Sequence, residues 1–252
     1  MAALMDVRKL NKHFGGLHAV RNVSFSVERG EIVGVLGPNG AGKTTLFNLL
    51  TGFIAPDAGA SIVFDGRSLI GLAPHRIAGL GVSRTFQLCR PFIGMSVLEN
   101  VVVGALGSKR DRGSDLEARA TTLLARVGLA GKERVPVEAL SYGDQRRLEI
   151  ARALAARPAL LLLDEPFAGL GSSEIADLSA LIRQVHADEG LSVVLIEHKL
   201  REFMRLVERV IALDFGEVIA QGTPEEIVRH PAVIEAYIGR DDASRMEPSH
   251  AA

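Results

Sequence analysis

A glycine-rich segment near the N-terminus contains the residue types that hold phosphate groups. GPNGAGKTT, at Gly37–Thr45, matches the pattern G-x-x-x-x-G-K-[ST]. It follows an apolar run, Ile32–Leu36, and precedes a helical pattern from about Gly42 to Leu50. Glycines let backbone N–H groups turn toward phosphate oxygens, and the start of the helix adds roughly half a positive charge. The segment therefore predicts a phosphate-binding loop between a strand and a helix.

The residues of this loop have separate expected roles. Lys43 is expected to bridge the β- and γ-phosphates of a nucleoside triphosphate, and the hydroxyl of Thr44 is expected to bind Mg²⁺. The backbone of the rest of the loop surrounds the phosphates in this prediction: Gly37, Asn39, Gly40, Ala41, Gly42 and Thr45. A glycine-rich turn with a chance lysine is the alternative, and the flanking strand and helix argue against it.

Two adjacent carboxylates follow a second apolar strand, in LLLLDEP at Leu160–Pro166. Asp164 is placed to bind Mg²⁺ directly or through water. Glu165 is placed to orient or deprotonate a water that attacks the γ-phosphate. Acidic residues at strand ends are commonly only solvated, but together with a phosphate loop they indicate a nucleotide hydrolase.

The string LSYGDQRRLEIARAL, at Leu140–Leu154, distinguishes this sequence from other phosphate-loop proteins. Ser141 has the residue type and position of a helix N-cap, and the helix is predicted to run through Ala156. Gly143 permits close approach of the backbone, and the exposed helix start is a second candidate anion site.

This string resembles the signature LSGGQ of the ATP-binding cassette (ABC) family. Tyr142 stands at the first glycine position, and Asp144 precedes Gln145. The resemblance implies that the helix start contacts the γ-phosphate of an ATP held by the phosphate loop of a second subunit. The contacting residues would be Ser141, Gly143, Asp144 and Gln145.

The resemblance also assigns roles to three isolated residues. Gln87, in SRTFQ, falls where the family has its Q-loop, which contacts Mg²⁺ and water and joins the core to a helical subdomain. His198, after VVLIE, is similar to the switch histidine that contacts the γ-phosphate. Phe14, ahead of two glycines, matches the aromatic residue that stacks on adenine. The implied catalytic set is Glu165, His198 and Gln87, and the implied metal ligands are Thr44, Gln87 and Asp164.

The similarity extends from about Val7 to Gly239 and is specific to the branched-chain amino acid import family. It rests on HFGGLHAVRNVSFSV, GKTTLFNLLTGF, RTFQLCRPFIGMSVLENV and GTPEEIVRHPAVIEAYIG. The resemblance implies transmembrane permease partners, a second ATPase subunit (identical or paralogous) in the ATP-bound state, and an indirect link to a periplasmic binding protein. It also implies a peripheral location on the cytoplasmic face of the cell membrane, attached through the permease. Similar subunits serve transporters of urea, short amides or aromatic acids, so the transported substrate stays open.

Two departures from the family pattern bear on function. Relatives carry AGLNP after the glutamate, whereas Gly171 replaces the asparagine here. In the family that side chain reaches toward the partner's phosphate loop, near Asn39, so we expect weaker communication between subunits. Relatives carry aspartate after the switch histidine, and Lys199 follows His198 here. We expect this change to alter only local charge. The apolar stretch Gln87–Met95 is the expected contact with a permease.

The elements that position these residues follow the rhythm of an α/β protein. Apolar runs at Ile32–Leu36, Ala159–Leu163 and Ser192–Ile196 alternate with helical patterns, which predicts a mostly parallel sheet covered on both faces. Val210–Gly222 indicates a hairpin that turns at Asp214–Gly216 and supplies an antiparallel part.

The middle of the chain is predicted to be helical. From about residue 88 to 156 the strand signals fade, and Leu116, Ala120, Leu123, Leu124 and Val127 mark one helix face. We interpret this stretch as a helical subdomain inserted into a P-loop core. Residues 1–239 then form one nucleotide-binding domain, and the polar residues 240–252 form a disordered tail.

Composition excludes several other classes of protein. The 252 residues include 47% hydrophobic and 23% charged ones, and 29 basic against 30 acidic residues leave a net charge of −1. No basic field therefore favours nucleic acid. The one cysteine, Cys89, excludes an internal disulfide, and no apolar run approaches the ~18 residues of a membrane span. The other histidines have no metal-ligand spacing.

Three alternatives remain open at this point. The ATPase subunit of an exporter, such as one for lipopolysaccharide, shares the same motifs, and neighbouring genes for two permeases and a binding protein would exclude it. A soluble ABC-class ATPase acting on DNA or ribosomes would usually carry two cassettes or a long coiled coil, and neither is present. A GTPase would carry the guanine-reading motif N-K-x-D, which is absent downstream of the loop.

Overall fold

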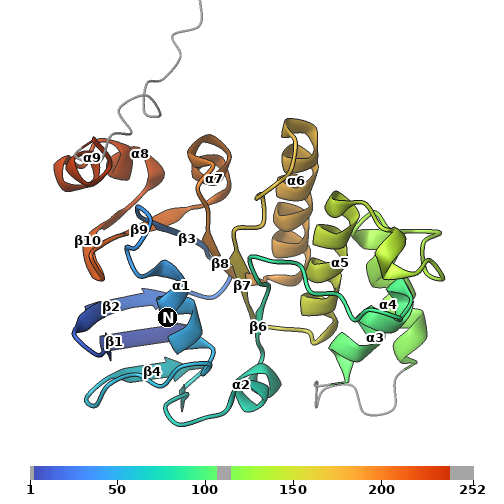
Figure 1. The fold of residues 1–252 in the computed structure, drawn as a ribbon, viewed down its shortest axis with the longest axis horizontal. Coiled ribbons are helices and arrows are strands. Elements are labelled where there is room, and N and C mark those ends of the chain that lie inside the picture. Colours follow the sequence, from blue (N-terminus) through green and yellow to red (C-terminus); the bar gives the residue numbers. More distant parts are fainter. Residues whose placement is uncertain (1–2, 107–114, 239–252) are drawn as a thin grey trace, which may run out of the picture.

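Two β-sheets organise the chain in the computed structural model, which describes residues 3–106 and 115–238 (Figure 1). The central sheet has the strand order β10-β9-β3-β8-β7-β6, and the second sheet has the order β2-β1-β4-β5. The central strands are β3 (Ile32–Leu36), β6 (Val82–Arg84), β7 (Leu160–Asp164), β8 (Ser192–Ile196), β9 (Arg209–Asp214) and β10 (Glu217–Gly222). The second sheet contains β1 (Met5–Phe14), β2 (Leu17–Val27), β4 (Ser61–Phe64) and β5 (Arg67–Ser68).

The central sheet is parallel except at one edge. Strand β3 pairs in parallel with β8 and β9, and β7 pairs in parallel with β6 and β8. The edge strand β10 returns antiparallel to β9 through the turn at Phe215 and Gly216, and the second sheet is antiparallel throughout. The predicted α/β class, with a mostly parallel sheet and an antiparallel part, is confirmed.

All five residues of β3, of β7 and of β8 are buried, because both faces of the central sheet are covered. Alternate residues of β3 belong to two different hydrophobic clusters: Ile32 and Leu36 lie in one, and Val33 and Val35 lie in the other. The strand predicted at Ala159–Leu163 is shifted by one residue, since β7 begins at Leu160 and includes Asp164. The shift places the carboxylate of Asp164 inside the sheet rather than after it.

The helices cover both faces of the central sheet. They are α1 (Lys43–Leu50), α2 (Pro74–Leu80), α3 (Val97–Ala105), α4 (Leu116–Arg126), α5 (Tyr142–Ala155), α6 (Ser172–Glu189), α7 (Leu200–Leu206), α8 (Pro224–Val228) and α9 (Pro231–Ile238). Helix α1 lies between the two sheets (Figure 1), and its Leu46, Phe47 and Leu50 pack with β1 and β2 in one cluster. The helix that follows the glycine-rich loop is therefore fixed from two sides.

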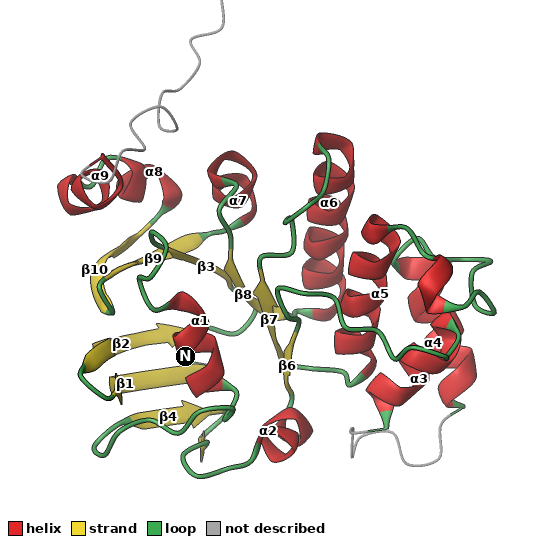
Figure 2. Ribbon diagram, viewed as in Figure 1, coloured by secondary structure: helices red, strands yellow, loops and turns green. Residues whose placement is uncertain are grey.

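Between β6 and β7 the described chain is helical, with α3, α4, α5 and a short 3₁₀ helix at Val137–Ala139. These helices lie together beside α6, on the side of the central sheet away from β9 and β10 (Figure 2). Ser96 and Glu99 form a capping box at α3. Ala120 and Leu124 of α4 are buried, as predicted for that helix face.

The C-terminal part follows its local signals. Thr223 caps α8, with Pro224 at the first helical position and the side chain of Glu226 accepting from the backbone of Thr223, as the capping-box pattern predicts. The predicted disordered tail at 240–252 lies outside the described residues. Among the described helices, none combines the length and apolar character needed to cross a bilayer.

Candidate functional site

The glycine-rich loop packs so tightly that its glycines are required. A Cβ atom on Gly37 would lie 2.3 Å from the carbonyl oxygen of Leu213 in β9. Gly42, the N-cap of α1, has φ 98°, and a Cβ there would lie 2.5 Å from the carbonyl oxygen of Ala19. Both positions therefore exclude other residues, one by close approach and the other also by backbone conformation.

The side chain of Lys43 folds back over this loop. Its Nζ donates to the carbonyl oxygens of Gly37 at 2.6 Å and Pro38 at 3.0 Å. Burial lowers the pKa of Lys43, while the charges of Glu165 and Asp164 oppose that shift. The ammonium group thus lies within the curve of the loop, where phosphate oxygens could replace the carbonyls as its partners.

A cavity of about 460 Å³ opens above the loop and collects most of the predicted site residues. The loop contributes Asn39, Gly40, Ala41, Gly42, Lys43, Thr44 and Thr45, and distant segments contribute Gln87, Glu165 and His198. The remaining wall comes from Leu17, His18, Ala19, Arg21 and Phe215. Segments far apart in the chain meet here because the carboxyl ends of parallel strands lie along one edge of the sheet.

Glu165 is held by both of the residues expected to act with it. His198 Nε2 lies 2.9 Å from Glu165 Oε1, and Gln87 Nε2 donates to Glu165 Oε2 at 2.9 Å. The backbone of Glu165 has φ 49°, in the left-handed region, which costs of order 1–3 kcal/mol for a residue with a side chain. Such strain is concentrated at functional positions, and here it turns the carboxylate toward the cavity.

Asp164, the neighbour of Glu165 in the chain, is buried and has one oxygen without a partner among the described residues. Its Oδ2 accepts from Arg84 Nη2 at 2.7 Å, whereas its Oδ1 is buried and has no hydrogen-bond partner among the described residues. Burial raises the pKa of Asp164, and the hydrogen bond and charge of Arg84 oppose that shift. Mg²⁺ prefers oxygen ligands, and the unpartnered carboxylate oxygen of Asp164, the hydroxyl of Thr44 and the amide oxygen of Gln87 are of that kind.

The signature residues form a second, separate cavity of about 200 Å³. Ser141, Gly143 and Asp144 line it together with Arg147, Leu170, Glu174 and Leu178, and no residue of the glycine-rich loop takes part. Ser141 Oγ accepts from the backbone N–H of Asp144 at 3.2 Å, which confirms the predicted cap. The side chain of Asp144 pairs with Lys132, and Gln145 Nε2 donates to the carbonyl oxygen of Leu140.

Phe14 is one of three predicted nucleotide-site residues, with Gly37 and Asp164, that do not line the first cavity. It ends β1 at the tip of the β1–β2 hairpin, is 44% exposed, and has the ammonium of Lys12 5.4 Å from its ring centroid. Its partner across the hairpin, Leu17, lines the cavity instead. The stacking of Phe14 on adenine stays a prediction, and Leu17 is the residue of this pair that lines the cavity.

Glu197 is a site residue that the sequence reasoning missed. Its buried carboxylate accepts from the backbone N–H groups of Phe167 at 2.5 Å, His198 at 2.9 Å and Lys199 at 3.2 Å. Burial raises the pKa of Glu197. This carboxylate ties the segment after Glu165 to the segment of His198. The signal in the sequence was an acidic residue at the end of a wholly apolar strand.

Lys199 does more than alter local charge, so that expectation is wrong. Its Nζ donates to the carbonyl oxygen of Leu170 at 2.9 Å, next to Gly171. The lysine side chain reaches from the end of β8 to the loop before α6. An aspartate, the residue of the family pattern, is shorter and its carboxylate could not donate to this carbonyl oxygen. The two departures from the family pattern thus lie side by side.

Arg146 and Glu149 form an ion pair beside the site that the sequence reasoning also missed. Arg146 is 2% exposed and donates to the carbonyl oxygens of Phe86 at 3.1 Å and Gln87 at 2.6 Å. It also contacts Glu149 Oε2 at 3.3 Å, and Glu149 Oε1 accepts from the backbone N–H of Phe86 at 2.8 Å. Helix α5 therefore holds the backbone at Gln87. Opposite charges three residues apart on a helix were the available signal.

Cys89 is unsuited to nucleophilic chemistry. Its Sγ lies 3.5 Å from Glu149 Oε2, and burial together with the nearby negative charge raises the pKa of the thiol to about 12. The reactive thiolate is therefore scarce near neutral pH.

Comparison with protein-family models gives two matches. A model described as "ABC transporter" matches residues 20–168, and one described as "Branched-chain amino acid ATP-binding cassette transporter" matches residues 217–243. The first includes the glycine-rich loop, the signature and the paired carboxylates.

Curated relatives match over almost their whole length. The chain is 44% identical over 250 residues to the high-affinity branched-chain amino acid transport ATP-binding protein LivG of Salmonella typhimurium. It is 42% identical over 250 residues to the corresponding protein BraF of Pseudomonas aeruginosa. Each comparison covers 94% of this chain and 98% of the relative.

Solved structures have the same fold. The ADP conformation of MJ1267, an ATP-binding cassette of an ABC transporter, superposes with a TM-score of 0.86 at 28% identity, covering 95% of this chain and 100% of that one. A dimeric post-hydrolysis state of the ATP-binding cassette MJ0796, bound to ADP and Pi, gives 0.78 at 26% identity, covering 87% of this chain and 98% of that one.

Proposed function

This chain belongs to the ABC transporter family, and we propose that it is the ATP-hydrolysing subunit of an importer for branched-chain amino acids or related small solutes. Two features support import of this substrate class. The identity to LivG and BraF extends over nearly the full chain, and the C-terminal match at residues 217–243 is specific to branched-chain amino acid cassettes.

The observation that carries the hydrolytic mechanism is the carboxylate of Glu165, held between Gln87 and His198 beside the phosphate loop. Lys43 and the loop N–H groups bind the β- and γ-phosphates. Glu165 accepts a proton from the attacking water, while Gln87 and His198 keep its two oxygens oriented. Mg²⁺, held by Thr44, Asp164 and Gln87, would offset the negative charge of the phosphates.

A second cassette is needed to complete the site. Ser141 and Gly143 line a cavity that shares no residue with the one above the glycine-rich loop. Their anion site therefore fits the γ-phosphate bound by another subunit, in a head-to-tail pair. Two copies of this chain or one copy with a paralogous cassette would both satisfy this geometry. The dimeric state of MJ0796, 26% identical, supports such pairing.

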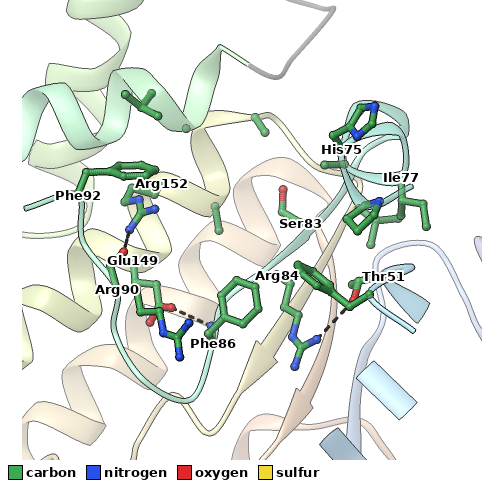
Figure 3. A pocket seen from close by; sticks show the side chains of 18 residues that line it. Thr51, His75, Ile77, Ser83, Arg84, Phe86, Arg90, Phe92, Glu149 and Arg152 are labelled. Carbon is green, nitrogen blue, oxygen red and sulfur yellow. Dashed lines mark hydrogen bonds between the residues drawn. The ribbon is translucent and has the colours of Figure 1, made fainter. Parts of the chain in front are cut away.

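A groove of about 610 Å³ between the central sheet and the helices is the proposed contact with a permease (Figure 3). Phe53, Phe86 and Phe92 line it and are 55%, 39% and 41% exposed. Beside it, Leu88 and Ile93 are 66% and 71% exposed, so this apolar stretch faces outward rather than packing inside. An exposed apolar cleft of this kind fits a cytoplasmic helix of the permease. The chain then sits peripherally on the cytoplasmic face, and a periplasmic binding protein contacts it only through the permease.

Reconstitution with two permease subunits and a periplasmic binding protein tests this function. We expect ATP-dependent uptake of radiolabelled leucine by vesicles, and no uptake when Glu165→Gln replaces the wild-type chain. Labelled urea is the comparison substrate. Uptake of urea without leucine would reassign the substrate class, and ATP-driven efflux in place of uptake would contradict an importer. Cysteine cross-linking between residues 87–95 and a permease loop tests the groove separately.

A further inference from the structure

Arg84 lines the proposed permease groove and bonds to Asp164, the residue before Glu165 of the nucleotide cavity. It is the last residue of β6, and its side chain is only 5% exposed. Figure 3 shows Arg84 among the side chains that line the groove, next to Thr51 and Phe86. The mechanism above assigns this buried cation no role.

The guanidinium group of Arg84 has partners at both terminal nitrogens, whereas its buried Nε has none among the described residues. Its Nη2 donates to Asp164 Oδ2 at 2.7 Å, and its Nη1 donates to Asn48 Oδ1 at 2.7 Å. Its plane is covered by the rings of Phe47 and Phe86, with centroids 5.5 and 5.0 Å from the guanidinium carbon. Asn48 and Phe47 belong to α1, the helix that carries the phosphate-binding lysine. The group therefore joins α1 to the end of β7.

This arrangement leaves the carboxylate of Asp164 a single orientation. Because Oδ2 is occupied by Arg84, only Oδ1 is left to bind a cation, and it is buried without a partner among the described residues. The backbone N–H of Asp164 donates to Thr85 Oγ1 at 3.3 Å, so the start of the side chain is fixed as well. Rotation of the carboxylate would break the contact with Arg84.

We infer that Arg84 is a positioning residue, which aims Oδ1 of Asp164 at the Mg²⁺ of the bound nucleotide by fixing Oδ2 against helix α1. The inference rests on the proposed function, since it requires that Asp164 serves the divalent cation. The alternative is that Arg84 and Asp164 form a buried ion pair that serves folding only. A measurement of stability alone cannot separate this role from the positioning role.

Arg84→Lys separates them because lysine keeps the charge but has one point donor group. It cannot hold the carboxylate and Asn48 at the same time as the planar fork of arginine does. Arg209→Lys is the matched control. Arg209 makes a two-point contact with Glu31, at 2.6 and 3.1 Å, and its partners lie outside the nucleotide cavity.

The experiment measures binding of a fluorescent ATP analogue to the full chain over a range of Mg²⁺ concentrations and in EDTA, with thermal unfolding in parallel. Changing a group that orients a metal ligand typically weakens metal affinity 10–100-fold. We expect Arg84→Lys to raise the Mg²⁺ concentration of half-maximal effect about 10-fold, with affinity in EDTA unchanged. Arg209→Lys is expected to leave that Mg²⁺ concentration unchanged.

Asn48→Ala provides a second test if Arg84→Lys does not fold. It keeps the ion pair and the longer contact of Nη1 with Thr51 Oγ1 at 3.4 Å, and removes the hydrogen bond to Asn48. We therefore expect a rise in the Mg²⁺ midpoint of about 3-fold, in the range of one lost hydrogen bond. An unchanged Mg²⁺ midpoint, or an equal loss of affinity in EDTA, would overturn the positioning role. If Mg²⁺ has no effect on nucleotide binding by the wild-type chain, the proposed function fails first.

Discussion

Replacing Arg146 by methionine removes the cation that holds the backbone at Gln87 against helix α5. The substitution leaves the carboxylate of Glu149, whose side chain is 10% exposed, without its ion-pair partner. It also leaves the carbonyl oxygens of Phe86 and Gln87 without their donor. Methionine fills a similar volume, so the loss is electrostatic rather than a cavity.

The expected loss of stability follows from the carboxylate of Glu149, which stays buried without its partner. Removing one partner of a buried ion pair typically costs about 3–5 kcal/mol. For a domain of this size each kcal/mol lowers the melting temperature by about 2–4 °C. We therefore expect Arg146→Met to lower it by about 6–20 °C. The double variant Arg146→Met, Glu149→Met removes both charges, so it should be more stable than Arg146→Met alone.

Thermal and urea unfolding of the wild type, the two single variants and the double variant complete a mutant cycle. We expect an interaction energy of about 1–3 kcal/mol between the two positions. ATP hydrolysis should fall in every variant, because the backbone that carries Gln87 is then held less firmly beside Glu165. Additive losses of stability, or hydrolysis at the wild-type rate in Arg146→Met, would refute the reasoning that this pair fixes Gln87.

Three further substitutions test other parts of the site. Glu165→Gln should lower the rate of phosphate release by about 10²–10⁴-fold and keep the affinity for fluorescent ATP. With Mg-ATP this variant should shift from monomer to dimer in light scattering, or pair with a paralogous cassette. Phosphate release at the wild-type rate would exclude Glu165 as the base. Gly171→Asn should fold normally, since φ is −77° and a Cβ meets only Glu174 Oε2 at 3.6 Å, and asparagine is at least as good an N-cap. Its steady-state ATPase curve should gain cooperativity, and an unchanged curve together with unchanged dimer affinity would mean that the position has no communicative role. Lys199→Met removes the donor to the carbonyl oxygen of Leu170, so cooperativity should fall while ATP affinity in EDTA stays the same; a parallel loss of both would indicate a general structural defect.

Local sequence determined the elements and the chemistry that each one carries. The glycine-rich loop was predictable because only glycine tolerates the contact at Gly37 and the backbone conformation at Gly42. The caps at Ser141 and Thr223 were predictable because a capping side chain bonds to N–H groups two or three residues away. Central strands buried on both faces are mostly apolar, as in the run Val193–Ile196 after Ser192, so β3 and β8 could be located to the residue.

The tertiary structure alone decided which of these residues meet. Arg84 and Asp164 are 80 residues apart, Arg146 and Gln87 are 59 apart, and Lys199 reaches Leu170 over 29. Such contacts depend on the order of strands in the sheet and on how α5 packs beside it, and neither is encoded in the spacing of a motif. The same limit applies to Phe14. The sequence located the hairpin, but which residues near its tip line the cavity, Leu17 among them, depends on how β2 packs against the glycine-rich loop, where Ala19 meets Gly42.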